Sequence, residues 1–140
     1  MELTMKKLPP LKKLVKKLDD VFQMCIRYRD GFTCITCGKK FPVGERTYCH
    51  AGHFISRKHF STRWDESNVA CQCASCNLKQ SFGDVETIHR YEIELKQRYG
   101  EDIIEELIRK SHQVNKLSRP YLEDMIEFYS NALEEYKKRS

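Results

Sequence analysis

The chain has 140 residues, of which 32% are charged and 40% hydrophobic, and its formal net charge is +5. This length suits one domain with a single core, and no apolar run approaches the roughly 20 residues of a membrane span. The first residues lack the apolar segment of a signal peptide. We therefore expect one domain, residues 1–140, in the cytoplasm, where cysteines stay reduced and favour metal binding over disulfides.

Residues 8–30 predict a basic N-terminal helix. After Pro9 and Pro10, apolar residues recur at intervals of three and four, which is the spacing of one buried helical stripe. These residues are Leu11, Leu14, Val15, Leu18, Val21, Phe22, Cys25 and Ile26. Cys25 lies on the stripe and is expected to be a core thiol, and Gly31 is suited to end the helix. The many lysines near the N-terminus would attract a phosphate backbone or simply form a solvated face.

Two Cys-x-x-Cys pairs lie within residues 31–83, one at Cys34 and Cys37 and the other at Cys73 and Cys76. The two-residue spacer lets both sulfurs of a turn reach one ion, and two such pairs supply the four ligands of a closed structural zinc site. We therefore expect a Zn²⁺ ion that joins the two ends of this segment. Cysteines without that spacer are expected to be core or loop thiols; these are Cys49 and Cys71.

The chain between the cysteine pairs is expected to form a hairpin. Residues 39–43 lead into a turn, and residues 47–55, which include aromatic and β-branched residues, are expected to return as its second strand. Residues 56–66 are polar without a clear period and predict an ordered loop. Residues 68–70 are too short to classify, and the chain should enter a helix from Asn77.

Residues 84–140 predict three helices that form a scaffold. Asp84 is a suitable N-cap for the first, which ends at Gly100. The second covers residues 103–114, and the third begins near residues 118–120, where a proline is tolerated in the first turn. The Leu and Tyr stripes of these helices could also supply the interface of a homodimer.

The order Cys-x-x-Cys, His, Asn, Cys-x-x-Cys-Asn resembles the HNH, or His-Me finger, endonucleases. Closer similarity to the NinG (Rap) recombination proteins of lambdoid phages lies in Ala51–Arg57, Arg63–Val69 and Gln72–Asn77, and the helix end at Arg27–Asp30 also fits. The resemblance implies an α+β fold: a zinc-clipped ββα-metal (HNH) core over residues 31–83, an N-terminal helix and three C-terminal helices. It also implies a phage-encoded recombination endonuclease in the bacterial host cytoplasm that cleaves branched DNA such as Holliday junctions.

The resemblance assigns roles to individual residues. His53 matches the general base that activates water, Asn77 matches a ligand of a catalytic Mg²⁺ ion, and Asn68 matches the residue that braces the loop bearing the base. Many relatives have Asp or Glu directly before the base, where this chain has Gly52. His50 is the best substitute ligand, and its imidazole nitrogen would favour Mn²⁺ over Mg²⁺. The reverse assignment, with His50 as the base and His53 as the ligand, stays open.

Basic residues near this site are expected to contact DNA phosphates, although a solvated basic loop is the alternative. These residues are Arg57, Lys58, Arg63 and Lys79. Trp64 is expected to anchor the loop in the core rather than to stack on a base. Besides the nuclease, the sequence allows a non-catalytic zinc-knuckle DNA-binding protein and a zinc-stabilised protein-interaction module. The DNA-binding alternative gives His50, His53 and Asn77 no common purpose, and the protein-interaction module would be favoured if DNA affinity were absent.

Overall fold

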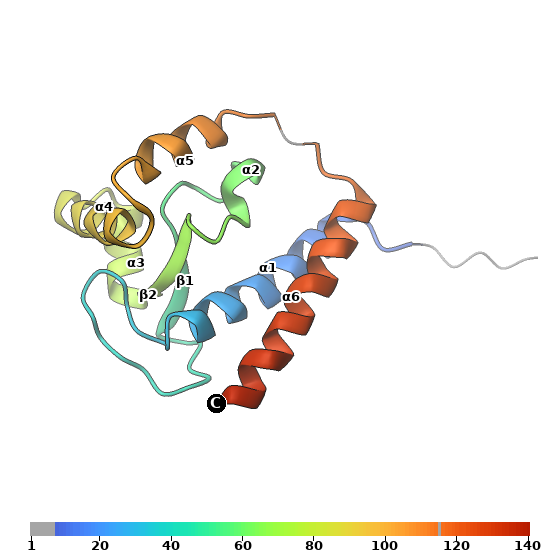
Figure 1. Ribbon diagram of the computed structural model, residues 1–140, viewed down its shortest axis with the longest axis horizontal. Helices are drawn as coiled ribbons and strands as arrows, with labels where there is room; N and C mark the ends of the chain where they lie inside the picture. Colours follow the sequence, from blue (N-terminus) through green and yellow to red (C-terminus); the bar gives the residue numbers. More distant parts are fainter. Residues whose placement is uncertain (1–7, 115) are drawn as a thin grey trace, which may run out of the picture.

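The computed structural model describes residues 8–114 and 116–140 of the chain. Helices lie on both sides of a small antiparallel sheet of two strands (Figure 1), so the fold belongs to the expected α+β class. The elements are α1 (Leu11–Arg29), β1 (Cys49–His53), α2 (Phe60–Arg63), β2 (Val69–Cys73), α3 (Ala74–Ser81), α4 (Val85–Tyr99), α5 (Ile103–Ser111) and α6 (Arg119–Arg139).

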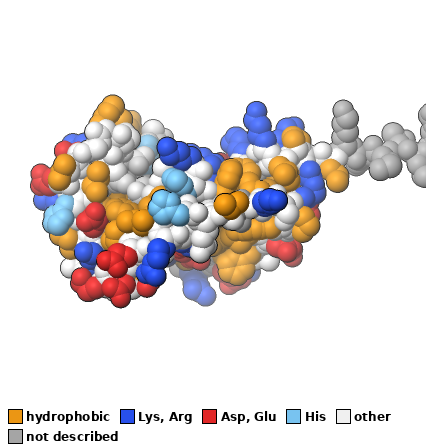
Figure 2. All heavy atoms as spheres, turned by 90° about the horizontal axis from the view of Figure 1, so that it is seen from above, with side chains coloured by type: hydrophobic (Ala, Val, Ile, Leu, Met, Phe, Trp, Pro, Cys, Tyr) orange, Lys and Arg blue, Asp and Glu red, His pale blue; other side chains and the backbone are white. Residues whose placement is uncertain are grey.

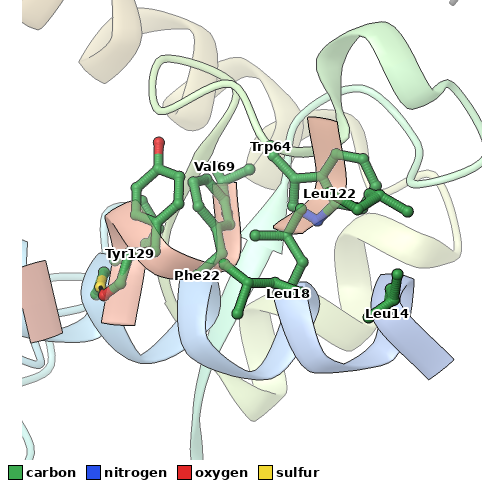
Figure 3. Close-up of a cluster of buried hydrophobic side chains, with 10 residues drawn as sticks. Leu14, Leu18, Phe22, Trp64, Val69, Leu122 and Tyr129 are labelled. Carbon is green, nitrogen blue, oxygen red and sulfur yellow. Dashed lines mark hydrogen bonds between the residues drawn. The ribbon is translucent and has the colours of Figure 1, made fainter. Parts of the chain in front are cut away.

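The N-terminal helix forms where the apolar stripe predicts it. Its buried face packs against α6, which runs alongside α1 in Figure 1 although about 90 residues separate the two helices in the sequence. The ring centroids of Phe22 and Tyr129 lie 4.9 Å apart in an edge-to-face contact. Cys25 is buried in this core, as expected, and its Sγ donates to the Tyr129 carbonyl oxygen at 3.2 Å. Figure 3 shows part of this cluster, in which Trp64 and Val69 meet the α1 stripe.

The prediction that residues 39–43 form a hairpin with β1 is wrong. Residues 39–43 form no strand; this segment contributes only an isolated bridge between Thr33 and Lys40. The partner of β1 is β2, in a register that pairs Cys49 with Cys73 and His53 with Val69. All five β2 residues are buried, and a short buried strand carries no period by which the sequence reveals it. The segment expected to be a loop between the strands also contains the short helix α2.

The start of α3 also differs from the prediction. The helix begins at Ala74, three residues before the expected position, and Cys73 is its N-cap. The Cys73 Sγ accepts a hydrogen bond from the Cys76 backbone N–H at 3.4 Å, so the cysteine takes the capping role of a Ser or Asp. As a result β2 leads directly into α3, with the second cysteine pair at the junction of the two elements.

The three C-terminal helices form as predicted but pack in two places. The Asp84 carboxylate caps α4 by accepting from the Thr87 backbone N–H at 3.0 Å. Helices α4 and α5 share a second apolar cluster with Ile35 and Ala70, whereas α6 returns to α1. Acidic side chains gather at the α4 and α5 end of the face in Figure 2, and hydrophobic side chains lie over α1 and α6. Within the described ranges, no helix has the length and apolar character required to cross a membrane.

Candidate functional site

Four cysteine sulfurs meet at the end of the sheet. The Sγ atoms of Cys34, Cys37, Cys73 and Cys76 all lie within 4.8 Å of one another, and those of Cys37 and Cys73 are 3.7 Å apart. Four sulfurs at zinc–sulfur distances of about 2.3 Å in a tetrahedron lie roughly 3.8 Å from each other. The cluster could therefore hold a metal ion such as zinc, and it contains the four predicted cysteines.

Hydrogen bonds prepare one of these thiols for metal binding. Burial by itself raises the pKa of Cys34, but hydrogen bonds from the Thr36 hydroxyl and from backbone N–H groups, including that of Cys37, outweigh burial and lower this pKa to about 6. Burial and the neighbouring Cys73 thiol instead raise the pKa of Cys76 to about 12. A metal ion must displace the protons of such thiols, so its binding depends on pH.

Cys49 and Cys71 lie outside this cluster, as expected. They occupy one face of the two strands, both are fully buried, and their Sγ atoms are 2.7 Å apart. They pack with Phe32 beneath the segment that carries the first cysteine pair.

A cavity of about 740 Å³ lies between α1, the sheet and α3. It is lined by His50, His53 and Asn77, so the structure brings together the three residues to which the resemblance assigns catalysis or metal binding. Arginines from three different segments also line it; these are Arg27, Arg46 and Arg57. No aspartate or glutamate of the described residues lines the cavity.

The imidazole of His53 is held neutral and in one tautomer. Its Nε2 atom lies 2.9 Å from the backbone carbonyl oxygen of Arg63. A carbonyl oxygen only accepts hydrogen bonds, so Nε2 carries the proton and Nδ1 keeps a lone pair. Burial lowers the pKa of His53 to about 4, so the ring is neutral near pH 7. His53 therefore has the protonation state that a general base requires.

The residue whose carbonyl orients His53, Arg63, is held through its side chain by Asp19, which the sequence did not suggest. The Asp19 carboxylate accepts from Arg63 at Nε (3.0 Å) and Nη2 (2.5 Å), from Trp64 Nε1 at 2.9 Å and from Arg57 Nη2 at 3.1 Å. Burial alone would raise the pKa of Asp19, but these partners outweigh burial and lower the pKa. An acidic residue next to the apolar stripe of a lysine-rich helix was the available signal.

Asn68 stabilises the segment that joins β1 to α2 and does not line the cavity. It is fully buried, its Oδ1 accepts from the Ile55 backbone N–H at 2.8 Å, and its Nδ2 donates to the carbonyl oxygens of Ile55 (3.1 Å) and Thr62 (3.0 Å). These three bonds tie together the two ends of the segment between β1 and α2. Asn68 thus holds the loop that carries the His53 acceptor.

His50 and Asn77 face each other across the strand–helix junction. The Nδ1 of His50 lies 3.4 Å from Nδ2 of Asn77, and the Nε2 of His50 lies 3.0 Å from the Thr47 carbonyl oxygen. The Thr47 carbonyl places the proton on Nε2, which leaves the Nδ1 lone pair toward the amide of Asn77. Among the described residues, only the cysteine cluster brings three or more His, Cys, Asp or Glu side chains close enough together to hold a metal ion. The Asn77 amide nitrogen, and not its oxygen, faces His50 here, so an ion held by both residues would require the amide to turn its oxygen toward the imidazole.

Two glutamines that the sequence did not single out support this site. Gln80 Nε2 donates to the His53 carbonyl oxygen at 3.0 Å, and Gln80 Oε1 accepts from Gln72 Nε2 at 2.9 Å. A Cβ atom at Gly52 would lie 2.1 Å from Gln72 Oε1. The buried Gln72 side chain therefore occupies the space that a side chain at residue 52 would need, which explains why glycine stands at this position.

The four basic residues expected on DNA are in different environments. Arg57 lines the cavity and keeps 52% of its side chain exposed despite its bond to Asp19. Lys58 is exposed on the loop, whereas the Arg63 side chain is only 14% exposed and is bonded to Asp19 and to the Arg57 carbonyl oxygen. Lys79 lies beside the cysteine cluster and not at the cavity. Trp64 is a buried core residue, as expected.

Comparisons with known proteins identify the family. Neither the curated proteins nor the solved structures contain a match to this chain. Residues 2–139 match the model of the family described as the bacteriophage lambda NinG protein, which covers almost the whole chain. The chain therefore belongs to the NinG family of phage recombination-associated proteins.

Proposed function

We propose that the chain is a metal-dependent endodeoxyribonuclease of the HNH type that cleaves branched DNA, such as Holliday junctions, in phage recombination. The observation that carries the proposal is the state of His53: a neutral imidazole with Nε2–H bonded to the Arg63 carbonyl oxygen and with a free Nδ1 lone pair, at a cavity lined by arginines. Membership of the NinG family supports the recombination setting.

The chemistry follows from this geometry. Nδ1 of His53 accepts a proton from water as the water oxygen attacks the phosphorus, and the bond from phosphorus to the leaving sugar oxygen breaks. His50 and Asn77 are the residues that would hold a divalent ion, which would supply electrophilic stabilisation of the phosphoryl oxygens and the leaving oxygen. Because one of its protein ligands is an imidazole, Mn²⁺ should serve better than Mg²⁺. The cysteine cluster would hold a structural Zn²⁺ ion, which would fix α3, and with it Asn77, against the sheet.

A non-catalytic DNA-binding protein is the second candidate. The observation that favours it is the absence of any carboxylate among the described residues that line the cavity, because carboxylates are the usual protein ligands of Mg²⁺. Such a protein would bind DNA through the same basic cavity and the same zinc-stabilised core.

The test is cleavage of a labelled four-way junction, a flap and a linear duplex, each with Mg²⁺ or Mn²⁺. Wild type should cut the branched substrates, and His53→Ala should cut at least 100-fold more slowly, which is the typical contribution of a general base. His89→Ala, which changes an exposed histidine of α4, is the matched control and should cut like wild type. Binding without cutting by wild type in both metals would select the second candidate.

A nuclease that resolves a junction must cut two strands, and a two-fold symmetric dimer is the commonest way to do so. We propose that α6 contributes to such a dimer, because Phe128 on α6 is 62% exposed. Sedimentation of the protein at working concentration should show a dimer, and Phe128→Ser should shift it toward monomer. A monomeric wild type would rule out this part of the proposal.

A further inference from the structure

Arg27 is a buried cation to which the proposed chemistry assigns no role. It lies near the end of α1, is 6% exposed and lines the cavity. Its Nε donates to the Cys49 carbonyl oxygen at 2.8 Å and its Nη1 lies 3.5 Å from the Met24 sulfur. No carboxylate of residues 8–114 and 116–140 lies within ion-pair distance of its guanidinium.

The other well-covered arginines of the protein do have carboxylate partners. Arg29 and Arg98 bond to Asp30 at 2.9 and 3.1 Å, and Arg63 bonds to Asp19. A buried charge without a counter-ion is costly, and proteins normally supply a partner for it. Burial accordingly lowers the pKa of Arg27. The exception at Arg27 therefore indicates an anion that arrives from outside the chain.

The surroundings of Arg27 are positively charged. Arg46, from the segment before β1, is exposed, lines the same cavity and lies close enough to Arg27 to disfavour its charge further. Arg57 lines the cavity as well, and no described acidic residue does. Guanidinium groups bind phosphate oxygens with paired, charge-assisted hydrogen bonds. A phosphodiester is thus the ligand that this cavity fits.

We propose that Arg27 and Arg46 form a seat for a backbone phosphate of the DNA strand, next to the phosphate that His53 would address. This inference rests on the proposed DNA substrate but not on cleavage. Arg27 is held by α1 and by its bond to the Cys49 carbonyl oxygen, so the direction of its guanidinium is fixed. Arg46 covers the seat from the solvent-exposed side of the cavity. The seat aligns the strand with the His50–Asn77 side of the cavity.

The first test measures binding of a labelled four-way junction by fluorescence anisotropy at several KCl concentrations, without added divalent ions. Arg46→Ala and Arg27→Gln should each weaken binding by roughly tenfold or more, the value of one charge-assisted hydrogen bond, and should reduce the slope of log Kd against log salt by about one. Arg109→Ala, which removes an exposed arginine of α5 away from the cavity, is the matched control and should leave both quantities unchanged.

The second test uses the dinucleotide dTpdT as the probe and the Nε–Hε NMR signal of Arg27 as the readout. Addition of dTpdT should shift this signal in wild type, whereas the uncharged methylphosphonate analogue should not. The NMR measurement uses the wild-type protein, so it tests phosphate binding at Arg27 even if Arg27→Gln fails to fold. Arg46→Ala changes an exposed residue and is expected to fold.

The outcomes separate the two proposals. Loss of affinity in both cavity variants together with no cleavage by wild type would retain the phosphate seat and overturn the nuclease. Wild-type affinity and salt slope in folded, zinc-loaded Arg46→Ala and Arg27→Gln would overturn the seat, whether or not wild type cuts. An equal loss in Arg109→Ala would also overturn it, because general surface charge would then account for binding.

Discussion

The Nε2 atom of His53 and the backbone carbonyl oxygen of Arg63 lie 2.9 Å apart, so the direction of the imidazole depends on how α2 is held. The Arg63 side chain is fixed by two bonds to Asp19 on α1. A residue 34 positions away in the sequence thereby sets the orientation of the proposed base. The buried charge of Asp19, the orientation of the His53 ring and the packing of α2 against α1 are therefore coupled.

Asp19→Asn should destabilise the protein and reorient His53. The substitution removes the negative charge that faces Arg63 and leaves a poorly exposed guanidinium without its counter-ion, which costs about 3–5 kcal/mol of unfolding free energy. Urea unfolding measures the cost, and the ¹⁵N chemical shifts of the His53 ring report its tautomer. Asp20→Asn is the matched control: Asp20 makes only an exposed bond to Lys16, so the change should stay within about 0.5 kcal/mol. Equal unfolding midpoints for the two variants would contradict this role of Asp19.

The stability of the protein should fall with acid before its carboxylates titrate. The pKa of His53 is about 4 in the folded protein because of burial, against 6.5 for an ordinary histidine. The unfolded chain therefore binds this proton more readily, and stability present above pH 6.5 is lost as the pH falls toward 4, by about 3 kcal/mol. Urea unfolding between pH 4 and pH 8 measures the slope.

His53→Gln should flatten that pH dependence, since glutamine can still donate to the Arg63 carbonyl oxygen but does not titrate. His89→Gln, on the exposed side of α4, should keep the wild-type slope. If His53→Gln and wild type lose stability in parallel across this range, His53 is not held neutral by the fold. Below the range, Asp19 should add a further loss, because its lowered pKa means that folding opposes its protonation.

Removal of zinc should unfold the region around β2 and α3. A structural zinc ion contributes about 10 kcal/mol or more of binding energy to folding, and the four cysteines that would hold it here join the first loop to the start of α3. Elemental analysis should give one zinc per chain in wild type and much less in Cys73→Ser, with loss of helical circular dichroism. Cys25→Ala removes a core thiol outside the cluster and should keep the zinc. Full zinc content in Cys73→Ser would show that the ion sits elsewhere.

Gly52→Ala should destabilise the protein because the new Cβ would meet Gln72 Oε1 at 2.1 Å. We expect a loss of about 1–3 kcal/mol, the usual cost of overpacking a buried site. A double-mutant cycle with Gln72→Ala measures the contact directly: the double variant should be more stable than the sum of the two single changes predicts. Strictly additive effects would mean that the two side chains do not compete for the same space, and the account of glycine at this position would fail.

The sequence alone determined the long helices and the cluster of four cysteines. Helices α1, α4, α5 and α6 were predictable because their hydrogen bonds and their three- and four-residue stripes are local. The cysteine cluster was predictable because a two-residue spacer makes both sulfurs of one turn available to the same ion. The three residues His50, His53 and Asn77 were singled out through the resemblance to the HNH and NinG families, and the cavity does bring them together.

Only the tertiary structure decided which strands pair and which charges face the site. Strand β2 is buried on both faces and shows no alternation, so its pairing with β1 depends on the helices that cover the sheet. From the sequence Arg63 is expected to be a surface cation. In the structure its side chain points inward because it bonds to Asp19 on α1. Arg27 reads as one more basic residue of a basic helix. Its significance appears only when α1 packs on β1, because burial without a carboxylate partner is a property of the packed neighbours and not of the residue itself.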